Sequence, residues 1–97
     1  MFTFLRWREW LALKAGALRS GDFEVSLKEN DRHLKGTALE IIARTKLASF
    51  RSYENGLVDY EVFDTTTSKW LAKETMISVN DGNFEQVFDQ FWSVARR

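Results

Sequence analysis

An Asn55-Gly56 pair separates two runs of strand-forming residues, and this arrangement constrains the fold more than any other feature of the chain. A tight β-hairpin turn needs positive φ angles at its central residues, and Asn and Gly adopt them at little cost. The runs on either side, residues 47–54 and 57–64, are rich in β-branched and aromatic residues. The sequence therefore predicts an antiparallel hairpin near the middle of the chain.

Three further segments have the pattern of strands, at residues 22–28, 37–44 and 70–79. In the first of them, Phe23, Val25 and Leu27 alternate with polar residues, which is typical of a strand with one buried face. Thr45-Lys46 is expected to form a tight turn after the second. His33 lies in a polar connection between strands, where a lone histidine without an orienting partner is expected to be a solvated loop residue.

Apolar residues recur every three or four positions at both ends of the chain, which predicts helices over residues 2–19 and 84–95. Ser20-Gly21 would end the first helix, because glycine accepts the left-handed conformation found there. Before the second helix, Asn83 and Gln86 have the spacing of a capping box.

The predicted order is α-β-β-β-β-β-α within a single domain, residues 1–97. Short connections between successive strands favour an antiparallel meander. Both helices have one apolar face, so the expected fold is α+β, a five-stranded sheet with the two helices packed on one face. The other face of the sheet would be solvated or open to a partner.

The two predicted tight turns place apolar residues of the central strands on opposite faces, which conflicts with a sheet that has one buried face. A two-residue turn at Asn55-Gly56 places Tyr53 and Arg51 on one face with the apolar residues of the next strand. A two-residue turn at Thr45-Lys46 then places Leu39 on the opposite face. A slip of one residue reverses every side chain of a strand, so one turn is expected to be longer, or a bulge to intervene.

The composition excludes several kinds of chemistry. The chain has no cysteine and one histidine, which excludes disulfides, thiol nucleophiles and cysteine-based zinc sites. Fourteen basic residues balance fourteen acidic ones, without the basic surplus that is usual in a nucleic-acid binder. The sequence contains no phosphate-binding or zinc-protease motif. We therefore expect a protein that is not an enzyme, that needs no cofactor or metal, and that binds no nucleic acid.

The sequence shows no targeting or membrane-spanning segment, and we therefore expect a cytoplasmic location. The first five residues are largely apolar, but Arg6, Arg8 and Glu9 interrupt any signal-peptide core. No segment approaches the roughly 20 apolar residues of a membrane span. The sequence thus predicts a cytoplasmic protein with no membrane partner.

Aromatic residues make up 14% of the chain, and this excess allows two interpretations. Large rings fill the core of a small domain that lacks disulfides. They also occur at the centres of protein interfaces. Both interpretations can hold for different residues.

The candidate binding residues are acidic or aromatic and follow the predicted hairpin: Glu54, Asp59, Glu61, Phe63, Asp64 and Trp70. Asp59 and Glu61 lie two apart on one strand and therefore face the same side. This group is interpreted as a solvated strand face, as an acidic surface that attracts a basic partner, or as catalytic carboxylates. Phe63 and Trp70 would either anchor a partner or cover the edge of the sheet.

The run Tyr53-Glu54-Asn55-Gly56, followed by Asp59-Tyr60-Glu61-Val62-Phe63-Asp64 and an amphipathic C-terminal helix, resembles small bacterial immunity proteins. These proteins are encoded beside polymorphic toxins, and the chain is similar over nearly its whole length to the TriTu immunity family. The resemblance implies a toxin domain of an Rhs-type effector, an ADP-ribosyltransferase that acts on elongation factor Tu. It implies that this chain binds the toxin as a monomer, one to one, and occludes its active site.

Two other functions remain open at this point. The first is a small-ligand-binding or catalytic α+β domain, with polar groups such as Arg51, Glu40 or Tyr60 between sheet and helices. The second is a secretion-chaperone or adaptor module, which would need a dimer interface.

Overall fold

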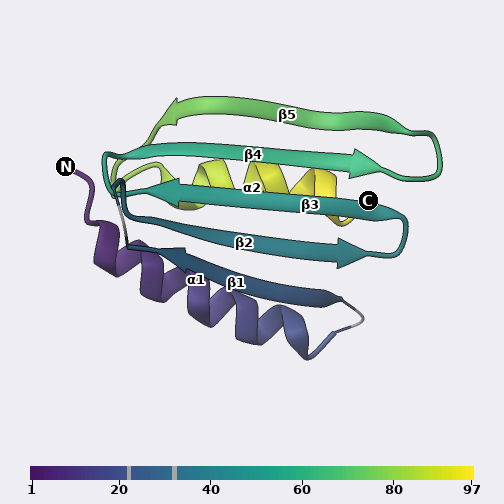
Figure 1. The fold of residues 1–97 in the computed structure, drawn as a ribbon, viewed down its shortest axis with the longest axis horizontal. Helices are drawn as coiled ribbons and strands as arrows, with labels where there is room; N and C mark the ends of the chain where they lie inside the picture. Colours follow the sequence, from purple (N-terminus) through teal and green to yellow (C-terminus); the bar gives the residue numbers. More distant parts are fainter. Residues whose placement is uncertain (22, 32) are drawn as a thin grey trace.

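The protein folds as one antiparallel sheet with both helices on the same face (Figure 1). The structure is a computed structural model that describes residues 1–21, 23–31 and 33–97. Its elements, in chain order, are α1 (Phe4–Arg19), β1 (Glu24–Asn30), β2 (Gly36–Ala43), β3 (Lys46–Tyr53), β4 (Leu57–Asp64), β5 (Lys69–Ser78) and α2 (Phe84–Ala95). The strands are adjacent in chain order, which confirms the predicted α+β meander. The predicted start of the first strand, Asp22, lies outside the described residues.

The two central turns resolve the conflict in register, because both differ from the predicted ones. β2 and β3 are joined at Arg44-Thr45, one residue earlier than expected, and Arg44 has a φ of 58°. Between β3 and β4 the turn has three residues and ends at Gly56, whose φ is 82°. This is the usual form of a three-residue hairpin loop, a turn followed by a left-handed residue. The predicted two-residue turns at Thr45-Lys46 and Asn55-Gly56 are therefore wrong, and the expectation of a longer turn is confirmed.

This register assigns the two faces of the sheet. Phe50 pairs with Leu39 on β2 and with Tyr60 on β4, so all three side chains point towards the helices. Arg51 pairs with Asp59 on the opposite face. The expectation that Arg51 shares a face with Tyr60 is wrong, because the longer turn shifts β4 by one residue.

The core consists mainly of aromatic rings between the sheet and the helices. Trp7 of α1 stacks on Phe84 of α2 with ring centroids 4.3 Å apart, so the helices meet directly. Phe50 of β3 contacts the same group, with its ring 5.1 Å from that of Phe88. Ring pairs at such distances contribute about 0.5–1.5 kcal/mol beyond the apolar area that they bury. The core interpretation of the aromatic excess therefore holds for these residues.

The turn before α2 is closed by two asparagines rather than by the predicted capping box. The side chain of Asn80 accepts hydrogen bonds from the backbone N–H groups of Gly82 and Asn83, at 2.8 and 3.1 Å. Asn83 is the N-cap residue, but its side chain accepts from the Asn80 N–H and makes no capping bond to the helix. The Asn83 side-chain oxygen is therefore bonded to a residue that precedes the helix, and the predicted capping box of Asn83 with Gln86 is wrong.

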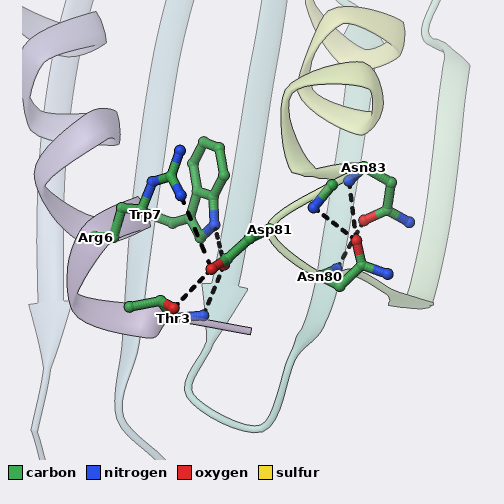
Figure 2. Close-up of polar contacts among 7 residues, drawn as sticks. Thr3, Arg6, Trp7, Asn80, Asp81 and Asn83 are labelled. Atoms are coloured by element: carbon green, nitrogen blue, oxygen red, sulfur yellow. Dashed lines mark hydrogen bonds and ion pairs between the residues drawn. The ribbon is translucent and has the colours of Figure 1, made fainter. Parts of the chain in front are cut away.

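Asp81 in this turn ties the start of the chain to α2 (Figure 2). One carboxylate oxygen accepts from the Thr3 N–H at 2.8 Å and from the Trp7 indole N–H at 2.7 Å. The other accepts from the Thr3 hydroxyl at 2.7 Å and lies 3.9 Å from Arg6. The Thr3 hydroxyl and amide, followed by the Trp7 indole, stabilise the charged form and lower the pKa of Asp81 from 3.8 to about 2.

We expect Asp81→Asn to reduce both the stability of the protein and its sensitivity to acid. Because the pKa of Asp81 is lower in the folded state, its carboxylate stabilises the fold above about pH 4. That contribution is lost as the pH falls towards 2. The melting temperature of the variant should therefore lie below that of the wild type at pH 7, and the difference should narrow between pH 4 and pH 2.

Thermal unfolding followed by circular dichroism at several pH values tests this expectation. Asp89→Asn, on the exposed face of α2, makes the same chemical change away from the turn and is the matched control. A difference between Asp81→Asn and the wild type that stays constant down to pH 2 would contradict the role given to this carboxylate.

Candidate functional site

The outer face of the sheet, on the side away from the helices, carries an apolar row that crosses four strands. In the observed register Ile42 of β2 pairs with Leu47 of β3, which pairs with Phe63 of β4, which pairs with Trp70 of β5. We call these four residues the apolar row. Since paired residues point to the same side of a sheet, the four side chains form one line across the strands.

The apolar row is well exposed for side chains of this kind. Ile42, Leu47 and Trp70 are 45%, 46% and 50% exposed, and Phe63 is partly buried beneath Trp70. The Phe63 and Trp70 rings meet edge to face with their centroids 4.9 Å apart. The Lys73 ammonium lies over the Trp70 ring, 4.6 Å from its centroid. These contacts hold the indole in one orientation while half of it stays open to solvent.

A second, polar row runs parallel to the apolar row. It consists of Glu40, Ser49, Glu61 and Lys73, which pair in the same way across β2 to β5. Each carboxylate has a neighbouring cation on the sheet: Lys28 lies 3.2 Å from Glu40, and Arg51 lies 3.4 Å from Glu61. Both pairs are partly exposed, so each stabilises the fold by at most about 1 kcal/mol.

An open groove of about 550 Å³ lies between these two rows. Ser49 leaves space for the groove because its side chain is small. The flanking residues on the same face of β3, Leu47 and Arg51, have larger side chains. One wall is apolar and the other bears the carboxylates of Glu40 and Glu61. Such a groove suits a side chain that has both an apolar stem and a charged end.

The structure brings together some of the site residues predicted from the sequence. Glu61, Phe63 and Trp70 line the groove. Asp59 lies on the same face, but its carboxylate accepts a hydrogen bond from the Met76 N–H at 2.8 Å. Asp59 therefore holds a bulge of β5, where an extra residue stands opposite it.

Glu54 and Asp64 lie away from this groove and accept hydrogen bonds from backbone N–H groups at the ends of the strands. The Glu54 carboxylate accepts from the Lys35 N–H at 3.2 Å, at the end of the sheet where β3 turns into β4. Asp64 accepts from the Thr66 N–H at 2.9 Å in the turn between β4 and β5. Neither residue lines the groove.

Sequence reasoning did not assign Ile42, Leu47 and Ser49 to the site, and it placed Glu40 and Arg51 between the sheet and the helices rather than on this groove. Within β2, Ile42 lies on the face opposite to the buried Leu39 and Ile41. A row across strands, however, depends on pairing between strands, and the register was unresolved. With the turns at their observed places, the same alternation would have found Leu47 opposite Ile42 and Phe63.

The residues suggested for a ligand pocket inside the fold do not meet. Arg51 and Glu40 lie on the outer face, whereas Tyr60 faces the helices and is buried. Burial, with a smaller effect from Glu74, raises the pKa of the Tyr60 phenol. The space beside Tyr60 is occupied by the rings of Phe50 and Phe91, at 6.3 and 5.7 Å.

Among the described residues, the structure has neither a metal-binding cluster nor a membrane-spanning helix. No group of three or more His, Cys, Asp or Glu side chains there is placed to hold a metal ion, and His33 is exposed in its loop. Neither of the two helices has the length and apolar character needed to cross a membrane.

Comparisons of the chain with family models, with curated proteins and with solved structures found no match.

Proposed function

We propose that this protein is an immunity protein that binds a cognate antibacterial toxin domain and occludes the toxin's active site. The observation that carries the proposal is the apolar row, with the half-exposed Trp70 fixed against Phe63 on a face that no helix covers. The resemblance of residues 53–64 to small immunity proteins supports the same function.

The chemistry of this face favours a protein as its partner. An exposed Trp packed on a second ring, among aliphatic side chains, is typical of the buried centre of an interface. The surrounding charges, among them Glu61 and Arg51, have the mixed character of an interface rim. The site is also open rather than enclosed, whereas small-molecule sites usually bury most of their ligand.

The resemblance also implies the identity of the toxin. It would be a domain of an Rhs-type effector, with ADP-ribosyltransferase activity towards elongation factor Tu. The immunity protein would act in the cytoplasm as a monomer that binds one toxin domain. It would block the active site by binding and would perform no chemistry of its own.

The test uses the toxin domain encoded next to the gene for this protein. We expect calorimetry to show a 1:1 complex with a Kd in the nanomolar range or tighter, on the order of −12 kcal/mol. Co-expression of the two proteins should restore the growth of cells that the toxin alone arrests. Absence of binding to this domain, or binding without protection, would overturn the proposal.

Light scattering of the free protein gives an independent check. The immunity function predicts a monomer. A symmetric dimer that buries Trp70 would instead favour the adaptor function, because the same face could not then receive a toxin.

A further inference from the structure

The groove between the two rows runs across the strands, and this direction limits what can lie in it. Only the edge strands of a sheet have unpaired backbone groups. An extended segment that crossed the middle of the sheet would leave its own N–H and C=O groups without partners when buried. A helix satisfies these groups internally, so a helix is the form of backbone that fits this groove.

The dimensions of the apolar row agree with a short helix. Its four residues span three spacings between strands, roughly 14 Å. A helix rises about 5.4 Å per turn, so two to three turns cover the row. An amphipathic helix would place its apolar stripe on Ile42, Leu47, Phe63 and Trp70.

The charges beside the apolar row determine the residue that the helix must carry. Glu40 and Glu61 are both paired with Ser49, so they stand on either side of it, about 10 Å apart. Their present cation partners are partly exposed and weakly held. A cation that enters above Ser49 would lie between two carboxylates, with its stem against Leu47 and Phe63.

We infer that the toxin domain docks an amphipathic helix across the outer face of the sheet, with an arginine of that helix inserted above Ser49 between Glu40 and Glu61. Arginine fits this position because its planar group can bond two carboxylates and its stem packs on apolar surface. The inference rests on the proposed function and specifies the partner chemistry of that site.

The area of the apolar row argues against a second copy of this chain as the occupant. Trp70 offers about half of the 150–250 Å² of a full aromatic side chain, and the row as a whole falls short of the roughly 800 Å² per partner of a stable interface. The occupant must therefore use the charged wall as well. A second copy would bring Glu40 and Glu61 against another apolar row or another pair of carboxylates.

Ser49→Lys tests the inference against a matched control. The new lysine would fill the groove and place its own cation between Glu40 and Glu61, where the arginine belongs. We expect the Kd for the adjacent toxin domain to rise by about 50-fold or more. Ser78→Lys makes the same change on the same face at the far end of the sheet, and it should change the Kd by less than about threefold.

Hydrogen exchange of the toxin domain in the complex identifies the segment that docks. An amphipathic helix that contains arginine should gain protection with wild-type protein, and replacing that arginine by Glu should weaken binding. If the wild type does not bind, the proposed function fails. If the wild type binds but Ser49→Lys behaves like Ser78→Lys, or the protected segment is a strand or loop, the function stands and this inference is overturned.

Discussion

Replacing Phe50 by alanine is expected to lower the free energy of unfolding by about 3–5 kcal/mol. The Phe50 side chain is fully buried at the centre of the aromatic core. Its ring lies within 6.3 Å of those of Tyr60, Phe84, Phe88 and Phe91, which come from a second strand and from α2. Small domains have total stabilities of only about 5–15 kcal/mol, so this variant should lose a large fraction of its stability and unfold at a markedly lower urea concentration.

Urea unfolding followed by tryptophan fluorescence measures this loss. Phe63→Ala is the matched control, because Phe63 is also a phenylalanine of a central strand but lies on the outer face and is partly exposed. It should cost less than half as much as Phe50→Ala. Equal losses would show that the outer face contributes to stability as much as the core does, which would contradict the placement of the core between the sheet and the helices.

Trp70→Ala is expected to weaken binding of the toxin domain by about 100-fold, or about 2.7 kcal/mol. Trp70 is the largest side chain of the apolar row, and Phe63 and Lys73 already hold its ring in place. Little side-chain freedom would therefore be lost on binding, which is how fixed aromatic residues contribute strongly at interfaces. The effect should appear mainly in the dissociation rate.

The fold should tolerate the loss of Trp70, since half of its surface is exposed. Surface-binding kinetics and a melting curve of the same variant separate the two effects. Leu13→Ala removes another exposed apolar side chain, on α1, and should leave the affinity unchanged. Weakened binding by Leu13→Ala together with an unaffected Trp70→Ala would move the interface to the helical side of the protein.

The order and type of the elements could be predicted from the sequence because side-chain periodicity reports directly on burial. Phe23, Val25 and Leu27 alternate as expected and pack against the core. The register could not be predicted, since it depends on which residues take a left-handed conformation. Arg44 does so at φ 58° although arginine has no preference for it. At the next turn Asn-Gly signals a hairpin but does not say whether the loop has two residues or three.

For the candidate site too, the sequence predicts what depends on one strand but not what depends on pairing between strands. The common face of Glu61 and Phe63 follows from alternation within one strand, and the structure places both on the groove. Leu47 and Ser49 belong to the groove through their pairing with other strands, which alternation within one strand does not reveal. Charge alone makes Glu54 and Asp64 candidates, yet turn carboxylates often accept hydrogen bonds from backbone N–H groups instead, as both residues do.

The irregular edge strand β5 affects the tendency of the protein to aggregate. A long, regular edge strand invites a neighbouring molecule to add a strand, and such additions lead to aggregates. β5 has an extra residue at two points, and it carries Lys69 and Lys73. These irregularities and charges oppose growth of the sheet from molecule to molecule. The proposed immunity function requires enough protein to bind every toxin molecule, and an edge strand that resists pairing favours a high concentration of unassociated protein.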